Sequence, residues 1–364
     1  MKIIHLSDLH LGMRLNEYSL IEDQEYILNQ ILEVIDCRKP DVIVIAGDVY
    51  DRSVPSAEAV CLLDKFLTEI AKRSIPTFVS SGNHDSAERL AFGSGIISNS
   101  KIYMSPVFTG EIMPVEINDE YGGVNIYMLP YLRHTRAIEV LENFTIDTDK
   151  RNVLVAHQFV TGAGRSDSEE VSVGGSDNID SSYFAGFDYV ALGHLHKPQN
   201  CKADNMIRYC GTPLKYSFSE VNDEKSVTVV TLAEKGNVSY ETVPLKPLRD
   251  LKQIKGKYAD LMRLDFYKNT TYTQDYMKII LTDEDDVPEA MGRLRSVYTN
   301  LMDLKYDNKR TQMNNIINAD ENVQKKTQIE LFRDFFQDQN NSEMSEEQEA
   351  FVSEAIKKVW GEEL

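Results

Sequence analysis

Short apolar runs alternate with amphipathic stretches through roughly the first 200 residues. Runs of this length that are rich in Val and Ile are typical of β-strands. We expect strands at 2–6, 41–47, 76–81, 124–129, 152–157 and 188–193, and two more at 226–232 and 238–245 around a Lys-Gly-Asn turn. The stretches 18–36 and 56–73 place their apolar residues at helical spacing. This alternation of strands and helices predicts an α/β sheet domain.

The pattern changes beyond this domain. Residues 161–182 are rich in Gly, Ser and Asp, which favours a long loop, and 244–256 has the character of a domain boundary. Apolar runs at 261–266, 276–283 and 300–307, with a helical stretch at 288–298, predict a small domain of strands and one helix. The last 40 or so residues contain two amphipathic stretches, and Ser345 and Gln348 have the spacing of a capping box. We expect a helical hairpin with exposed apolar faces.

Composition narrows the class of protein. A hydrophobic content of 42% and a charged content of 27% are typical of a soluble globular protein. The net charge of −19 excludes a basic, histone-like nucleic-acid binder, but not an enzyme whose bound cations receive phosphates. The four cysteines lack metal-site spacing, and no apolar run approaches the ~18 residues of a membrane span. We therefore expect a cytoplasmic protein without a membrane segment.

Polar side chains follow five of the predicted strands at the point where each strand ends. Because ligands of open α/β sheets bind at the carboxyl ends of strands, we expect these side chains to converge. Five of the seven histidines belong to this set. Its members are Asp8 and His10, Asp48, the triplet Asn83, His84 and Asp85, then His157, and finally His194 and His196.

The chemistry of the set points to metal ions. A single Asp or His after a strand is more often a structural residue, but five such clusters together are difficult to explain structurally. Carboxylate, imidazole and amide ligands without thiolate suit Mn²⁺, Fe²⁺ or Mg²⁺, with Zn²⁺ possible. So many ligands suit two ions about 3.5–4 Å apart, which can clamp the attacking and leaving oxygens of a phosphoryl transfer.

The motifs that carry these residues resemble a known superfamily. "DLHLG", "GDVYDR", "GNHD", "VAHQ" and "GHLH" follow the order and spacing found in the calcineurin-like binuclear metallophosphoesterases. Within that superfamily, "SDLHLG", "ALGHLHKPQ" and "GTPLKYSFSE" (211–220) resemble the SbcD family, the nuclease subunits of bacterial SbcCD complexes. The resemblance implies a four-layer αββα sandwich with a smaller α+β capping domain and a C-terminal helical hairpin.

The resemblance also implies roles for individual residues. One metal ion, Mn²⁺ by preference, would be held by Asp8, His10, Asp48 and His196. A second would be held by Asp48, Asn83, His157 and His194, with Asp48 bridging the two. His84 would act on the phosphate as a catalytic group, and Asp85 would orient His84. A 3′–5′ double-strand exonuclease and single-strand or hairpin endonuclease for DNA repair and recombination is the implied function.

Three domains follow from the same resemblance. Residues 1–247 would form the nuclease domain, 248–320 a capping domain that helps to bind DNA, and 321–364 a helical segment that binds the coiled coil of an SbcC-like ATPase. Lysine and arginine residues between 252 and 278 give modest support to DNA binding. A homodimer is also expected.

The sequence leaves open several alternatives for residue roles and for the function. Arg52 either faces a phosphate or forms an ion pair with Asp51. His5 is interpreted as a core or strand-edge residue, and His134 as a surface or turn residue. The same scaffold also serves phosphatases and small-molecule phosphodiesterases. A non-catalytic scaffold that holds DNA ends for the ATPase is the remaining alternative.

Overall fold

The computed structural model describes residues 1–161, 163, 178–201, 206–312, 327–340 and 343–360. Within it the chain divides into two compact units, Met1–Leu251 and Lys252–Leu364. Most of the loop predicted at 161–182, and the domain boundary predicted at 320–321, lie outside the described residues.

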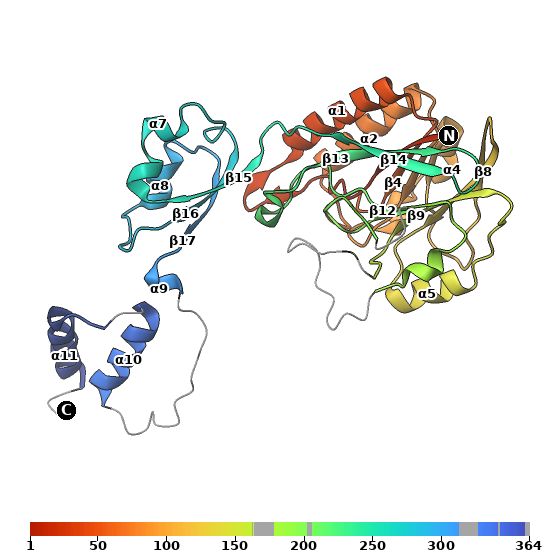
Figure 1. The fold of residues 1–364 in the computed structure, drawn as a ribbon. Coiled ribbons are helices and arrows are strands. Elements are labelled where there is room, and N and C mark those ends of the chain that lie inside the picture. Colours follow the sequence, from red (N-terminus) through yellow and green to blue (C-terminus); the bar gives the residue numbers. More distant parts are fainter. Residues whose placement is uncertain (162, 164–177, 202–205, 313–326, 341–342, 361–364) are drawn as a thin grey trace. The chain divides into compact units, whose positions relative to one another are not determined.

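Two six-stranded sheets form the first unit (Figure 1). The first has the order β14 (Val238–Pro244), β13 (Ser226–Leu232), β1 (Lys2–Leu6), β4 (Val42–Ala46), β5 (Thr77–Ser80) and β6 (Ile102–Met104). The second has the order β11 (Gln199–Asn200), β12 (Ile207–Tyr209), β10 (Tyr189–Gly193), β9 (Arg151–His157), β8 (Gly122–Leu129) and β7 (Val115–Asp119). A small antiparallel pair joins β2 (Arg14–Leu15) to β3 (Tyr18–Ser19). The central strands of both large sheets run parallel.

Helices cover the outer faces of the two sheets. In Figure 1, α1 (Ile21–Arg38) and α2 (Ala57–Lys72) lie on one side of this unit, and α5 (His134–Glu142) lies on the other. The shorter helices are α3 (Ala87–Leu90), α4 (Ser94–Ile97), and the 3₁₀ turns η1 (Ser98–Ser100), η3 (Ser181–Phe184) and η4 (Phe218–Glu220). Ala137 and Leu141 of α5 pack into one buried cluster with Leu129 of β8.

The core between the sheets explains why the central strands are apolar throughout. Val42 and Val44 of β4 share one buried cluster with Val153 and Val155 of β9, so the two sheets meet face to face. Neighbours such as Ile43 point to the opposite, helix-covered face and are also fully buried. Strands buried on both faces read as continuous hydrophobic runs. The layers are helix, sheet, sheet and helix, which confirms the predicted αββα sandwich.

All eight strands predicted in this unit are confirmed. The pattern did not reveal β6, β7, β11 and β12 of the two large sheets, nor the small pair of β2 and β3. Of these, β11 and β12 contain only two and three residues. β7 is an edge strand whose sequence, VEIND, contains mostly polar residues. Short and edge strands bury little apolar surface, so their hydrophobic signal is weak.

The second unit contains a three-stranded sheet. Its elements are β15 (Leu251–Gly256), α6 (Tyr258–Leu261), α7 (Leu264–Tyr267), β16 (Tyr276–Leu281), α8 (Ala290–Arg295), β17 (Leu301–Tyr306) and α9 (Lys309–Gln312). The strands predicted at 276–283 and 300–307 and the helix at 288–298 are confirmed. The strand predicted at 261–266 is wrong, because these residues form parts of two short helices around buried Leu261. The missing strand is β15, where Leu251 and Ile254 supply the buried side chains.

Two further helices, α10 (Gln328–Asn340) and α11 (Glu346–Trp360), confirm the predicted C-terminal hairpin. The predicted capping box is present, because the Ser345 N–H donates to Oε1 of Gln348 and the Gln348 N–H donates to Oγ of Ser345. Arg333 of α10 forms an ion pair with Glu349 of α11. Among the described helices, none combines the length and apolarity that crossing a membrane requires.

Candidate metal centre

The polar side chains predicted to converge do lie at one rim of the first unit. Asp8 and His10 follow β1, Asp48 follows β4, and Asn83 follows β5. His157 ends β9, and the last two histidines follow β10. Strands of both sheets therefore contribute, and their carboxyl ends face a common centre.

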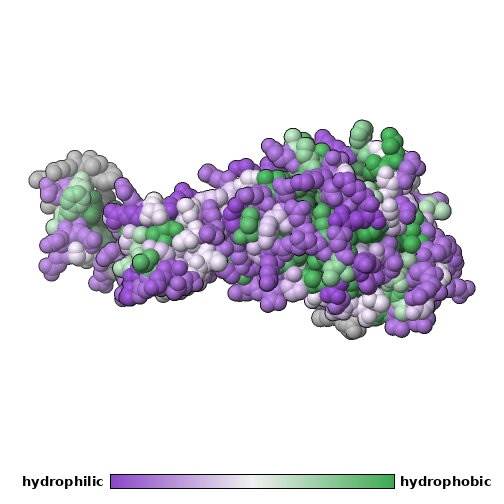
Figure 2. Space-filling view, turned by 90° about the horizontal axis from the view of Figure 1, so that it is seen from above, coloured by the Kyte–Doolittle hydropathy of each residue, from purple (hydrophilic) through white to green (hydrophobic). Residues whose placement is uncertain are grey.

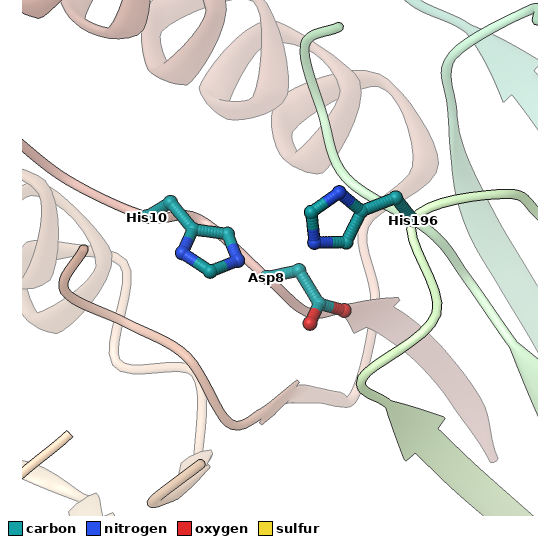
Figure 3. Close-up of side chains that lie close together, drawn as sticks. All are labelled: Asp8, His10 and His196. Carbon is teal, nitrogen blue, oxygen red and sulfur yellow. The ribbon is translucent and has the colours of Figure 1, made fainter. Parts of the chain in front are cut away.

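Asp8, His10 and His196 each offer a ligand atom, and these atoms lie within 4.8 Å of one another. Figure 3 shows the two rings and the carboxylate converging on a shared space. Asp8, Asp48 and His157 form a second group with the same spacing. Nε2 of His157 lies 3.2 Å from Oδ2 of Asp48, which places Asp48 between the two groups.

Asn83 approaches the same ring nitrogen of His157 as Asp48 does. Its Oδ1 is 3.0 Å from Nε2 of His157 and 3.1 Å from Nδ1 of His194. The seven predicted ligands thus form two overlapping sets. One surrounds His10 and His196, and the other surrounds His157 and His194.

The backbone at this rim is strained. Four of the predicted ligands have left-handed φ angles: Asp8 (51°), His10 (43°), Asp48 (48°) and His194 (102°). Non-glycine residues adopt this conformation at a cost and retain it where the surrounding structure requires it, commonly at functional sites. Here the turns after three strands direct these polar side chains toward the centre.

Two glycines allow the loops to approach each other. A Cβ atom on Gly82 would lie 2.1 Å from Oδ1 of Asp48. A Cβ atom on Gly193 would lie 1.8 Å from the carbonyl oxygen of Ala46. A side chain at either position would force apart the strand ends and loops that carry the predicted ligands.

The donor set fits divalent cations. Within the described part of the chain, neither ring nitrogen of buried His10 has a hydrogen-bond partner. Nδ1 of His157 lies 2.9 Å from the carbonyl oxygen of Ala46 and donates to it, so Nε2 is the ring nitrogen that faces the oxygens of Asp48 and Asn83. Only a proton or a cation can join a nitrogen lone pair to these oxygens. Buried polar atoms of this kind are the expected lining of a metal site.

The pKa values of these side chains are shifted because several titratable groups are buried close together. Burial disfavours the charged forms, raising the pKa of Asp8 to about 6 and lowering the pKa of His10 to about 3. Burial also opposes protonation of His157, but the charge and hydrogen bond of Asp48 outweigh it and raise the pKa of His157 to about 9. The pKa of Asp48 is lowered, because the surrounding histidines outweigh its burial. In the chain itself, a proton on His157 occupies the place that suits a cation.

His84 stands at the edge of the centre. It is partly buried, its backbone N–H donates to Oδ1 of Asp48 at 2.8 Å, and its ring centroid lies 4.8 Å from that of His10. Its Nδ1 lies 2.8 Å from the carbonyl oxygen of Asp51. The ring is therefore oriented by a backbone carbonyl of the "GDVYDR" loop.

This contact corrects the role expected for Asp85. Its carboxylate accepts hydrogen bonds from the backbone N–H groups of Val49, Tyr50 and Gly82 at 2.9–3.0 Å. Asp85 clamps the loop after β4 to the loop after β5, and does not orient His84. A sequence cannot show which acceptor a ring nitrogen faces, because that depends on how two loops pack.

The structure also gives the contacts of three other residues for which the sequence suggested roles. Arg52 is exposed and its Nε lies 3.4 Å from Asp51, so the ion pair, one of the two contacts that the sequence left open, is present at the rim of the centre. His5 is buried and its Nδ1 lies 2.8 Å from the hydroxyl of Tyr189, which confirms a core role. His134 begins α5, with Nε2 3.0 Å from the carbonyl oxygen of Asn178.

Residues near the centre that sequence reasoning assigned no role include Ser7, Gln24 and Glu220. Ser7 donates to Oδ2 of Asp8. Gln24 of α1 donates to the carbonyl oxygen of His10 at 2.7 Å. Glu220 lies in the segment "GTPLKYSFSE", which the sequence singled out, but the sequence did not indicate its contact with His196.

Comparison with known proteins agrees with this geometry. Residues 1–198 match the family described as calcineurin-like phosphoesterase. The chain belongs to this family. Residues 247–340 match the family described as type 5 capsule protein repressor C-terminal domain, whose short name is SbcD_C. The calcineurin-like phosphoesterase fold therefore carries the whole metal centre, and the C-terminal match covers β15 to α10.

A curated relative places the chain within this family. The SbcD subunit of the nuclease SbcCD from Staphylococcus epidermidis is 36% identical over 325 residues, which cover 84% of this chain and 85% of the relative. The resemblance to the SbcD family is thereby confirmed, and the chain is a phosphoester hydrolase of this family.

Solved structures of lower similarity also match. A protein from Thermus thermophilus is 10% identical with a TM-score of 0.41, covering 66% of this chain and 98% of that one. A dimetal phosphatase from Danio rerio is 12% identical with a TM-score of 0.40, covering 68% of this chain and 98% of that one.

Proposed function

We propose that this chain is a metal-dependent DNA nuclease, acting as a 3′–5′ double-strand exonuclease and a single-strand or hairpin endonuclease. The observation that carries the proposal is the convergence of seven nitrogen and oxygen ligands from both sheets on one rim. The relative from Staphylococcus epidermidis, which is named as a nuclease, supports DNA as the substrate.

The side chains of the centre suit two divalent ions. We propose that both are Mn²⁺, with Mg²⁺, Fe²⁺ and Zn²⁺ as alternatives to test. Asp8, His10, Asp48 and His196 would hold one ion. Asp48, Asn83, His157 and His194 would hold the other. When bound, such ions supply positive charge to the phosphoryl oxygens and lower the pKa of water near them.

His84 is the proposed catalytic residue of the chain. Its Nδ1 is fixed by the carbonyl oxygen of Asp51, so Nε2 is the nitrogen available to a substrate. A protonated ring can stabilise negative charge on the phosphate or give a proton to the leaving oxygen from Nε2. Asp85 supports this arrangement indirectly, because it clamps the loop that carries His84. Arg52 is the proposed contact to a phosphate of the DNA backbone.

The His84→Ala variant tests this assignment. It should cleave blunt-ended and hairpin DNA at least about 100-fold more slowly, since general acid–base groups contribute about 10²–10⁴-fold. Its content of Mn²⁺ should stay at the wild-type value, because His84 is not a proposed ligand. The His134→Ala variant is the matched control, since this ring lies on α5.

The choice of substrate needs a second comparison. The wild-type chain should digest double-stranded DNA ends with Mn²⁺ more efficiently than it turns over p-nitrophenyl phosphate. The opposite ranking would favour a phosphatase. A chain that binds both ions but leaves every DNA substrate intact would favour a scaffold that only holds DNA ends.

We further propose that residues 248–320 form a capping domain that contributes to DNA binding. Lys257 and Lys268 are exposed there. Lys255, Arg263 and Lys278 lie in ion pairs with Asp307, Asp265 and Asp303. The exposed lysines are therefore the first candidates for phosphate contacts, and replacing both with Glu should weaken DNA binding at low salt.

The C-terminal hairpin is the proposed binding segment for an SbcC-like coiled-coil ATPase. Phe332 and Phe335 of α10 and Phe351 of α11 are exposed, the last at 73%. Figure 2 shows a hydrophobic area on these helices among hydrophilic residues. Apolar helix faces of this kind dock on a partner helix. An SbcC-like partner would place the protein in the cytoplasm with its DNA.

A homodimer is proposed through the surface near α2 and α4. Phe92 and Ile96 are 86% and 77% exposed, and Val60 of α2 is 44% exposed. They adjoin a groove of about 380 Å³ lined by residues of α2, α3, α4 and β6. Exposed apolar clusters of this kind mark interaction surfaces. The Phe92→Glu variant should shift the chain toward the monomer in sedimentation measurements.

A further inference from the structure

The segment 211–225 encloses the backbone of His196. A Cβ atom on Gly211, whose φ is 77°, would lie 2.7 Å from the carbonyl oxygen of His196. The backbone N–H of Thr212 donates to the same oxygen at 3.1 Å. The close approach of this segment requires glycine at 211 and fixes where His196 can lie.

A buried ion pair between Lys225 and Glu220 also contacts the backbone of His196. Nζ of Lys225 donates to the carbonyl oxygen of His196 at 2.8 Å, to Oγ1 of Thr212 at 2.7 Å and to Oε2 of Glu220 at 2.6 Å. Glu220 is fully buried and Lys225 is 6% exposed. Removing an ammonium and a carboxylate from water is costly, and the fixed contacts of both groups offset that cost.

The second oxygen of Glu220 meets the ring of His196. Oε1 lies 3.2 Å from Nδ1 of His196, and the Tyr216 N–H approaches Oε2 at 3.4 Å. A carboxylate that is held by an ammonium is a hydrogen-bond acceptor, so Nδ1 carries the hydrogen. Nε2 then keeps its lone pair. This is the nitrogen left to meet Asp8 and His10, toward which the ring extends in Figure 3.

We propose that Glu220, held in place by Lys225, is a positioning residue that fixes the tautomer and direction of His196 for metal binding. The inference rests on the proposed role of His196 as a ligand. A hydrogen bond from the distal nitrogen of a ligand histidine to a carboxylate increases the basicity of the ring and limits its rotation. Glu220 contacts His196 and no other proposed ligand in the described hydrogen bonds, so it acts on one ion of the two.

The first experiment measures metal binding by the full chain. After removal of metal with a chelator, Mn²⁺ is titrated calorimetrically and bound ions are counted by elemental analysis. The Glu220→Ala variant should bind one of its two ions about 10–100-fold more weakly, the usual effect of losing a carboxylate behind a metal ligand. The second ion, near Asn83 and His157, should bind with its wild-type constant.

A second readout does not depend on metal. Long-range ¹H–¹⁵N correlation spectra of the metal-free chain report which nitrogen of His196 carries the hydrogen. Wild type should show the hydrogen on Nδ1, and Glu220→Ala should show a mixture of tautomers. The double variant Glu220→Gln with Lys225→Met removes both charges but keeps an acceptor for Nδ1. It should restore Nδ1 protonation and recover most of the lost metal affinity.

The matched control is the carboxylate of another ion pair, one whose cation is buried. Asp119 pairs with buried Arg151 in the same unit, remote in sequence from every proposed ligand. The Asp119→Asn variant should lose stability but bind both ions as wild type does. Two ions bound by Glu220→Ala within twofold of the wild-type constants would overturn the inference. If the wild-type chain binds fewer than two ions, the two-ion function fails separately, and the tautomer of His196 decides the role of Glu220.

Discussion

Nδ1 of His157 lies 2.9 Å from the carbonyl oxygen of Ala46, the last residue of β4. This contact joins the end of a strand in the second sheet to the end of a strand in the first. It also turns Nε2 of His157 toward Asp48. The packing of two sheets thus fixes the tautomer of a proposed metal ligand.

The raised pKa of His157 predicts a pH dependence of metal binding. Without metal, the folded ring stays protonated up to a pKa of about 9, whereas an unfolded ring loses its proton near the ordinary value of 6.5. A bound ion must displace this proton. The apparent affinity for Mn²⁺ should therefore rise with pH from about 7 to 9, by up to tenfold per unit if one proton is released.

The same shift sets the stability of the metal-free chain. Because the folded pKa is raised, the stabilisation from His157 is complete below about pH 6.5 and is lost as pH rises through about 9. Thermal unfolding in a chelator should show this decline, and saturating Mn²⁺ should reduce it. Calorimetry in buffers of different ionisation enthalpy counts the released proton. Metal affinity that is flat from pH 7 to 9 would contradict the prediction, and His134→Gln should leave the slope unchanged.

His194 and His196 should serve different ions. His194 lies 3.1 Å from Oδ1 of Asn83, and His196 belongs to the group with Asp8 and His10. Each alanine variant should therefore bind one ion normally and lose the other. Elemental analysis should find close to one Mn²⁺ per chain for either variant. Their double variant should hold none, whereas His5→Gln should hold two, since buried His5 contacts the hydroxyl of Tyr189 and no proposed ligand in the described hydrogen bonds.

Gly82 should tolerate no side chain. The Cβ of a Gly82→Ala variant would lie 2.1 Å from Oδ1 of Asp48, so the loop after β5 must move. We expect a loss of about 1–3 kcal/mol of stability, as for other overpacked sites, together with loss of both ions. Gly95→Ala is the control, because its Cβ would meet nothing within 4 Å. Urea unfolding and metal content of the two variants give the comparison.

The C-terminal helices should be dispensable for metal binding but necessary for the partner. The double variant Phe335→Glu and Phe351→Glu places charges on the exposed apolar surface of the hairpin. It should keep both ions and its nuclease activity, yet no longer co-purify with a co-expressed SbcC-like ATPase. Tyr26→Glu is the control, because Tyr26 is an exposed aromatic residue of α1. Retained co-purification would show that another surface binds the partner.

The sequence alone predicted the strands that form the two sheets, because strands buried on both faces must be apolar along their whole length. It also predicted which polar side chains converge at one rim, since residues of the types that bind metals stand directly after those strands. The capping box of Ser345 and Gln348 was equally visible, because it depends on residues three apart. Each of these features is local in the chain.

The tertiary structure decided which hydrogen bonds form between residues that lie far apart in the sequence. Asp85 stands next to His84, yet its carboxylate binds the loop after β4, and the ring of His84 binds the carbonyl of Asp51. Glu220 lies 24 residues from His196 and meets it through a buried contact. Local patterns determine which residues follow a strand, but hydrogen-bond partners depend on how the loops of two sheets pack. That packing arises from the shared core of the sheets and is absent from any single stretch of sequence.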